Sequence, residues 1–301
     1  MKRVISISLG TSKRDHKVEQ QFGGQLFSIE RIGTDGDKQK AIRLIRELDG
    51  KVDAFGLGGT DLYIYAGARR YTFRESAQIA AAAQLSPIVD GSGIKNTLER
   101  RVVRFLEAKR GMEFRGRKAL LVCAVDRFGL AEALVDAGAE TTFGDLLFGL
   151  GLPFPIRKLN TLARLAKLVA PVITRLPISL FYPTGDKQNE FQPRFGSYFR
   201  EADIIAGDFH FIRRYMPLEL DGKTIITNTV TKEDQELLKS RGVALLVTTT
   251  PEMGGRSFGT NILEAVLVAT AGQRPENLTT EDYGRILDEL GVEPRIETFC
   301  Y

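Results

Sequence analysis

The chain alternates strand-like and helix-like segments along its length, and this alternation constrains the fold more than any other feature. Arg3–Leu9 and Val52–Leu57 are short apolar runs typical of strands, whereas Lys38–Leu48 has apolar residues at helical spacing. Strands joined through helices pair in parallel and are covered by helices on both faces. The sequence therefore predicts an α/β protein.

The same patterns place the other elements. Further strands are expected at Leu26–Ile32, Pro87–Val89, Lys118–Val125, Ala139–Phe143, Pro177–Tyr182, Ala202–Ala206, Lys223–Asn228 and Val243–Thr249. Further helices are expected at Ser76–Leu85, Lys95–Lys109, Gly129–Ala137, Lys158–Val169, Asn261–Thr270 and Glu281–Leu290.

The length of 301 residues suits two domains. The stretch 111–116 is charged and punctuated by glycine, which indicates a boundary between two α/β domains, 1–112 and 113–301. A hydrophobic content of 43% and a charged content of 27% are close to globular averages and exclude a mainly disordered chain.

The charge balance argues against a nucleic-acid partner. Lys and Arg number 42 against 38 Asp and Glu, a net charge of +4. The excess is local, because residues 100–118 hold eight Lys or Arg and two Glu. This stretch suits either an anionic ligand or a solvated helix face. We expect a small-molecule substrate, and we leave a homodimer open.

The chain has two cysteines and two histidines, which excludes a disulfide framework and a His-rich zinc site, so no metal is expected. Cys123 lies in an apolar run and is expected to be an inert buried thiol. The N-terminal apolar stretch is too short for a signal peptide, and no run approaches the roughly 18 apolar residues of a membrane span. We expect a cytoplasmic protein with no membrane partner.

The turn after strand 118–125 is the expected cofactor site. Residues 124–129 read AVDRFG where a dinucleotide turn reads G-x-G-x-x-G, so Gly129 alone is kept. Asp126 at the second glycine position repels a pyrophosphate, and Arg127 can compensate by pairing with it. Asp145 follows the next strand, where a ribose-binding acid is expected, which favours NAD over NADP. The alternative is an ordinary α/β turn in which Asp126 caps the helix.

Polar residues also end the later strands. Asn228, Thr229, Thr248 and Thr249 suit a ribose or a nicotinamide amide, although turns and caps use the same residue types. The glycine-rich loop 251–261 precedes a helix and suits an anion or a moving flap, or else is a surface loop.

Three glycine-bearing strand ends in the N-terminal half, 10–15, 56–61 and 90–97, form the expected substrate site. Their hydroxyls, carboxylates and cations suit a polyhydroxy or carboxylate substrate, with Ser12, Arg14, Thr60, Asp61, Ser92 and Asn96 as binding residues. Lys95, or else Lys13, serves as general acid/base if burial lowers its pKa. Capping residues and solvated lysines are the alternative.

Segments 8–16, 52–59 and 89–101 resemble prokaryotic proteins labelled quinate 5-dehydrogenase. The resemblance spans nearly the whole chain and implies kinship with the shikimate/quinate dehydrogenases. That kinship implies an N-terminal substrate domain and a C-terminal, Rossmann-like doubly wound nucleotide-binding domain, with the last helix packing back on the first domain. The chain lacks the N-x-T-x-P-x-K segment and the G-A-G-G-type turn of shikimate dehydrogenases, so only Lys95 is carried over as a catalytic residue.

These observations together predict an oxidoreductase that uses NAD or NADP on a small polar, anionic hydroxy substrate of the quinate or shikimate kind. Two alternatives stay open. One is a ligand-binding or regulatory protein without catalysis, built on a degenerate Rossmann fold, and Asp126 favours it. The other is a transferase that uses a different nucleotide-like cofactor.

Overall fold

The computed structural model describes residues 1–66, 69–177, 191–253, 256–257 and 259–299. The chain forms two compact units: unit 1 comprises Met1–Lys95, Val169–Gln188 and Phe258–Val292, and unit 2 comprises Asn96–Leu168, Asn189–Ser257 and Glu293–Tyr301. The division falls in the first turn of helix α3 (Ser92–Arg110), whereas the expected boundary at 112/113 lies beyond the end of this helix. Gly111 therefore directly follows the end of α3, Gly116 lies in the turn before β8, and neither glycine separates the units.

Unit 1 is built on a five-stranded sheet in the order β2-β3-β1-β4-β7. Its strands are β1 (Lys2–Ser8), β2 (His16–Phe22), β3 (Gln25–Gly33), β4 (Ala54–Gly58) and β7 (Ile88–Val89). All pairings are parallel except that of β2 with β3. The other elements of the unit are η1 (Ser12–Arg14), α1 (Lys38–Leu48), β5 (Tyr63–Ala66), β6 (Arg69–Thr72), α2 (Arg74–Ala80), α9 (Thr260–Ala271), η5 (Pro275–Asn277) and α10 (Thr280–Glu289).

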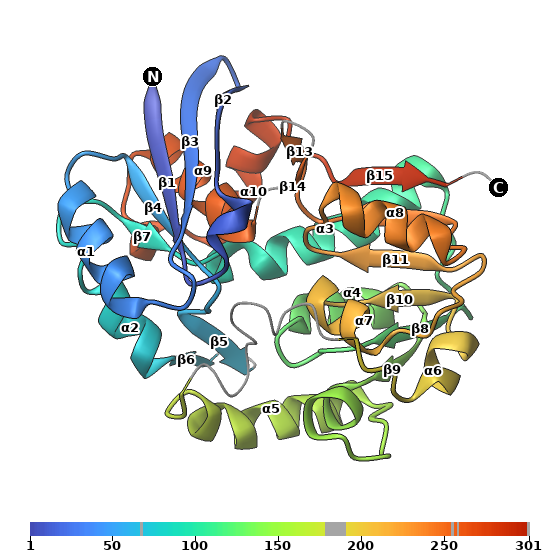
Figure 1. Cartoon of the computed structure of the whole chain (residues 1–301). Helices are drawn as coiled ribbons and strands as arrows, with labels where there is room; N and C mark the ends of the chain where they lie inside the picture. The colour runs from blue at the N-terminus through green and yellow to red at the C-terminus, as the bar shows by residue number, and fades with distance from the viewer. Residues whose placement is uncertain (67–68, 178–190, 254–255, 258, 300–301) are drawn as a thin grey trace. The chain divides into compact units, whose positions relative to one another are not determined.

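Alternate residues of β1 and β4 face different helices. Ile5, Ile7, Phe55 and Leu57 join α1 and α2 in one buried core. On the other face α9 packs on β4 and β1, and α10 packs on α9 (Figure 1). The glycines of β4 let α9 come close, because a Cβ at Gly56 would lie 3.0 Å from the Asn261 carbonyl oxygen. The last helix of the chain thus belongs to unit 1.

Unit 2 is built on a six-stranded sheet in the order β15-β12-β11-β10-β8-β9. Its strands are β8 (Lys118–Leu121), β9 (Glu140–Phe143), β10 (Ile204–Ala206), β11 (Thr224–Thr227), β12 (Leu245–Thr248) and β15 (Arg295–Thr298), and only β15 is antiparallel to its neighbour. The strand order reverses between β8 and β10, which is the switch point where doubly wound sheets bind ligands.

Helices cover both faces of this sheet. Ala119 and Leu121 of β8 pack with α4 (Phe128–Asp136) and α5 (Leu159–Ile173), and with the part of α3 in unit 2. Leu120, between them, packs with α6 (Gly196–Glu201), α7 (Phe209–Tyr215) and α8 (Lys232–Ser240). The prediction of two α/β domains with a Rossmann-like, doubly wound C-terminal sheet is therefore confirmed.

Some elements differ from the sequence expectation. The β2 strand was not predicted, and neither were the β5–β6 hairpin, α7 and α8. The expected strand Pro177–Tyr182 lies, apart from Pro177, outside the described residues, as do residues 254, 255 and 258 of the expected 251–261 loop. The described part of that loop holds β13 (Glu252–Met253) and β14 (Arg256–Ser257), which pair with each other.

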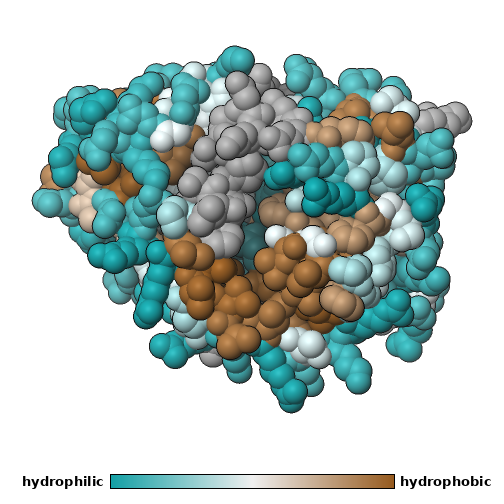
Figure 2. All heavy atoms as spheres, turned by 60° about the horizontal axis from the view of Figure 1, so that its bottom comes forward, coloured by the Kyte–Doolittle hydropathy of each residue, from teal (hydrophilic) through white to brown (hydrophobic). Residues whose placement is uncertain are grey.

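Apolar side chains stay exposed along α5 and on the segment before it, at Leu150, Leu152, Phe154, Leu168 and Val172. Figure 2, turned toward the side on which α5 lies, shows apolar surface gathered there. None of the helices in the described part of the chain is long and apolar enough to cross a membrane.

Candidate functional site

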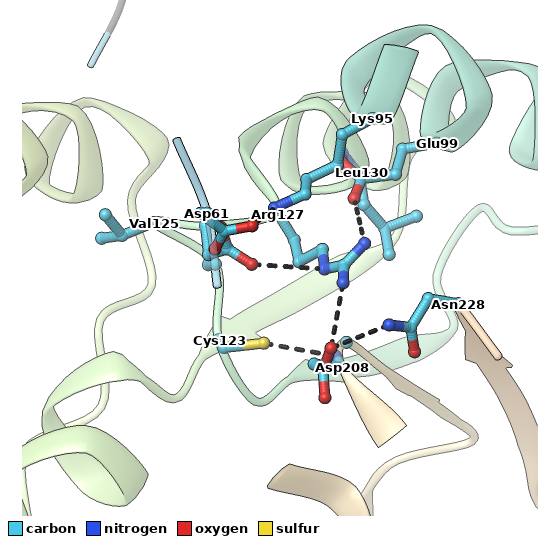
Figure 3. Close-up of polar contacts among 12 residues, drawn as sticks. Asp61, Lys95, Glu99, Cys123, Val125, Arg127, Leu130, Asp208 and Asn228 are labelled. Atoms are coloured by element: carbon cyan, nitrogen blue, oxygen red, sulfur yellow. Dashed lines mark hydrogen bonds and ion pairs between the residues drawn. The ribbon is translucent and has the colours of Figure 1, made fainter. Parts of the chain in front are cut away.

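The structure pairs two of the predicted site residues of unit 1, Lys95 and Asp61 (Figure 3). Asp61 follows the end of β4, and Lys95 lies in the first turn of α3, shortly after β7. Lys95 Nζ donates to Asp61 Oδ1 at 3.3 Å, and the two side chains are 10% and 13% exposed. A nearly buried ammonium–carboxylate pair thus lies at the carboxyl end of the parallel sheet, where α/β proteins bind ligands.

Buried hydrogen bonds fix the loop that carries Asp61. The Thr60 and Ser76 hydroxyls are 2.6 Å apart, and the Leu62 amide donates to Asp90 Oδ2 at 2.5 Å. The Ser92 hydroxyl also donates to Asp90 Oδ2. Burial raises the pKa of Asp90, although these donors and the Lys95 charge counteract the rise. The side chains of Thr60 and Ser92 thus hold the loop, and this is the role that the structure shows for them.

Glu264 is a buried carboxyl that the sequence analysis did not identify. Its Oε2 accepts from the Gly91 amide at 2.6 Å, and its Oε1 accepts from the Tyr283 hydroxyl at 3.1 Å. Burial, and then the nearby Asp90 charge, raise the pKa of Glu264 to about 8. The available signal was a single acidic residue inside the apolar run 262–269.

The predicted strand end at residues 10–15, which follows β1, lies at the surface. Ser12 and Lys13 are exposed and Arg14 is half-buried in η1. The acid/base role considered for Lys13 requires burial, which is absent at this position. The Ser12 amide donates to Asp35 Oδ1 at 2.7 Å, so this loop is tied to the end of β3.

In unit 2, Asp145 binds the turn between β8 and α4. Its Oδ2 accepts from the Ala124 amide at 3.1 Å and its Oδ1 from the Val125 amide at 2.8 Å. Burial raises the pKa of Asp145 to about 6, against the effect of these amides. Asp145 does follow β9, as predicted. Its carboxylate, which was expected to bind a ribose, instead accepts hydrogen bonds from the protein backbone.

The N-terminus of α4 is capped by two side chains from α3. The Gly129 amide donates to Asn96 Oδ1 and the Leu130 amide donates to Glu99 Oε2, both at 3.0 Å. Asp126 does not cap the helix, since Arg127 is the N-cap residue and its side chain makes no capping bond. Asn96, expected to bind substrate, therefore serves as a helix cap.

Arg127 is buried among carboxylates (Figure 3). Its guanidinium lies 3.1 Å from Glu99, 3.1 Å from Asp208 and 3.5 Å from Asp126. Burial acts to lower the pKa of Arg127, but the three carboxylates outweigh burial and hold the pKa well above its ordinary value. Arg127 does pair with Asp126, as expected, and it also links α3 to the end of β10.

The later strand ends bond to one another. Asn228 Nδ2 donates to Asp208 Oδ2 at 2.8 Å, and Asn228 Oδ1 accepts from the Phe209 amide. The Thr248 hydroxyl donates to the Thr250 carbonyl at 2.7 Å. Thr249 is buried, and Thr229 is half-buried after β11. Asn228 and Thr248 thus have the turn roles that were the alternative to ribose binding.

These contacts decide whether the turn fits a dinucleotide. A Rossmann pyrophosphate needs open amides at the strand–helix turn and a glycine gap for close approach. Here the amides of residues 124, 125, 129 and 130 donate to side chains of the protein. The turn as folded therefore does not fit a dinucleotide pyrophosphate. Among the described residues, no three His, Cys, Asp or Glu side chains are grouped so as to hold a metal ion.

Comparisons with known proteins find solved structures at low identity and no curated relative. No curated protein matches the chain. Among solved structures, an NAD-dependent malic enzyme from Thermotoga maritima has 12% identity and a TM-score of 0.35 over 97% of this chain and 85% of its own. A hetero-hexameric glutamate dehydrogenase from Thermus thermophilus has 13% identity and a TM-score of 0.42 over 96% and 74%. GanP, a glucose-galactose binding protein from Geobacillus stearothermophilus, has 8% identity and a TM-score of 0.36 over 99% and 97%.

Two family models cover almost the whole sequence. One, described as a domain of unknown function (DUF8753), matches residues 3–90. The other matches residues 93–299, so the two matches meet close to the division between the units in α3. The chain belongs to the family described as a domain of unknown function (DUF8754).

Proposed function

We propose that the chain is an enzyme that acts on a small polar hydroxy substrate, with Lys95 and Asp61 as its acid/base pair. The observation behind this proposal is the 3.3 Å contact between two nearly buried, oppositely charged side chains at the carboxyl end of the unit 1 sheet. Desolvation strengthens the electrostatic interaction between these two groups.

Each member of the pair has its own task. The Lys95 ammonium donates a proton to a developing alkoxide, or the neutral amine takes a proton from a hydroxyl. Asp61 accepts a hydrogen bond from Nζ and so keeps the amine oriented. Asp90 holds the Asp61 loop through the Leu62 amide. The pair thus supplies the proton-transfer half of a reaction at a C–O bond.

Quinate and shikimate are the first substrates to try, because the resemblance at segments 8–16, 52–59 and 89–101 implies this class. Their oxidation also needs a hydride acceptor, NAD or NADP. The β8–α4 turn does not fit the pyrophosphate of either, so the proposal rests on proton transfer alone and assigns no residue to hydride transfer.

The test is turnover of quinate, shikimate and their dehydro forms, with and without NAD or NADP. Reduced nicotinamide is followed by absorbance, and proton exchange into the substrate by NMR in deuterated water. Lys95→Met should lower the rate about 10²–10⁴-fold. The matched control is Lys13→Met at the exposed strand end, which should retain the wild-type rate. Near-normal turnover by the Lys95 variant would refute the role.

A ligand-binding protein without catalysis is the second candidate. The specific observation in its favour is that protein side chains fill the cofactor turn of unit 2. On this alternative the wild-type chain turns over none of these compounds, but one of them raises its melting temperature. Lys95→Met then changes the affinity for that compound only.

A further inference from the structure

We propose that Glu99 is a built-in substitute for a ligand phosphate, and that it closes the β8–α4 turn to dinucleotides. This inference concerns unit 2 alone and does not depend on the role proposed for Lys95 and Asp61. It explains why the chain keeps a doubly wound sheet without the glycine-rich sequence that normally accompanies nucleotide binding.

The first step is the position of the Glu99 carboxylate. The first amides of a helix have no partner within the helix and carry partial positive charge, so this end of a helix attracts phosphates. In α4 the Leu130 amide donates to Glu99 Oε2 at 3.0 Å, and the Arg127 guanidinium donates to Glu99 Oε1 at 3.1 Å. One carboxylate thus uses two oxygens to bridge a helix N-terminus and an arginine, as a phosphate does.

The second step is that three further amides of the turn also donate to protein side chains. The Gly129 amide donates to Asn96 Oδ1, and the Ala124 and Val125 amides donate to Asp145. The acceptors are Asn96 in α3 and Asp145, which follows β9. A phosphate that binds these amides has to displace at least one of the acceptors.

The third step is space. A Cβ at Gly129 would lie 2.8 Å from the Asn96 Cα and 3.0 Å from the Asn96 carbonyl oxygen. Because Gly129 has no side chain, the backbone of α3 can pack closely against it. In a dinucleotide turn, the corresponding glycines admit the ligand and the neighbouring strand.

The fourth step is charge. Arg127 faces Glu99, Asp208 and Asp126, so three carboxylates already lie around this guanidinium. Glu99 is 1% exposed, and its displacement would leave a buried carboxylate without its amide and its arginine. Both the charge and this loss oppose a second anion at the turn.

Chemical rescue tests the inference. Glu99→Ala empties the place of the carboxylate, so inorganic pyrophosphate should bind there and raise the melting temperature of the variant by roughly 5–10 °C at about 100-fold excess over Kd. The wild-type chain should respond no more to pyrophosphate than to sodium chloride of equal ionic strength. The matched control is Glu132→Ala on α4, which removes a half-exposed partner of Arg100 and should behave as the wild type.

Hydrogen exchange of the wild-type chain provides a measurement that needs no variant. The Gly129 and Leu130 amides should be protected without ligand, and millimolar NADH or NADPH should leave their exchange unchanged. The inference is overturned if either nucleotide or pyrophosphate stabilises the wild-type chain and alters exchange at these amides. It is also overturned if folded Glu99→Ala gains no response to pyrophosphate.

Discussion

Replacement of Glu264 by Gln should remove most of the pH dependence of unit 1 stability between pH 5 and 9. The Glu264 carboxyl is buried in α9, and its pKa rises from 4.5 to about 8 because of burial and the Asp90 charge. Because the folded chain holds this proton more tightly than the unfolded chain, the contribution to stability is full below pH 4.5. It is lost as pH rises toward 8.

The magnitude follows from the same values. One pKa unit corresponds to about 1.4 kcal/mol, so a rise from 4.5 to about 8 amounts to a loss on the order of 4 kcal/mol between pH 5 and 9. Glutamine cannot ionise, so Glu264→Gln should resemble the wild type near pH 5 and be more stable at pH 9. The pKa of Asp90 is also raised, which leaves a smaller slope of the same sign in the variant.

The assay is urea unfolding at five pH values, followed by the fluorescence of the eight tyrosines in a chain without tryptophan. The matched control is Glu47→Gln on the exposed face of α1. Its free energy of unfolding should depend on pH as that of the wild type does. Tyr283→Phe removes a donor to the Glu264 carboxylate and so raises the pKa of Glu264 further. The loss of unfolding free energy in this variant should therefore continue to higher pH. Equal slopes for Glu264→Gln and the wild type would show that Glu264 ionises in its ordinary range and would refute the reasoning.

Other predictions test packing and local structure. Gly129→Ala should cost about 1–3 kcal/mol in urea unfolding, because the added Cβ meets the α3 backbone. Gly284→Ala on α10, where a Cβ meets nothing within 4 Å, should instead stabilise by about 0.5–1 kcal/mol. Thr279→Ala should cost about 1 kcal/mol, since Thr279 forms a capping box with Asp282 at the start of α10; no loss would contradict the cap. Burial raises the pKa of the Cys123 thiol, so a chain with Cys300→Ser should react with a thiol reagent only after unfolding, and rapid native reaction would contradict this burial.

The sequence predicted the elements whose residues repeat with a regular period. The Lys38–Leu48 helix has the predicted ends, because Asp37 caps it and its apolar residues recur on one face. The parallel arrangement also follows from the alternation of elements. The pattern was less informative for β2, which is a half-exposed edge strand rich in polar residues, and for α7, whose first residues follow directly from a strand end.

The residues at the strand ends could be identified from the local pattern of strands and turns. Their hydrogen-bond partners depend on the tertiary structure. Asp61 and Lys95 meet across 34 positions of the sequence, and Glu99 reaches the Leu130 amide across 31. A strand end shows that a polar group needs a hydrogen-bond partner, but both a ligand and a neighbouring helix satisfy that need. In the folded chain α3 lies against the β8–α4 turn, and its Glu99 carboxylate binds the Leu130 amide where a cofactor phosphate was expected.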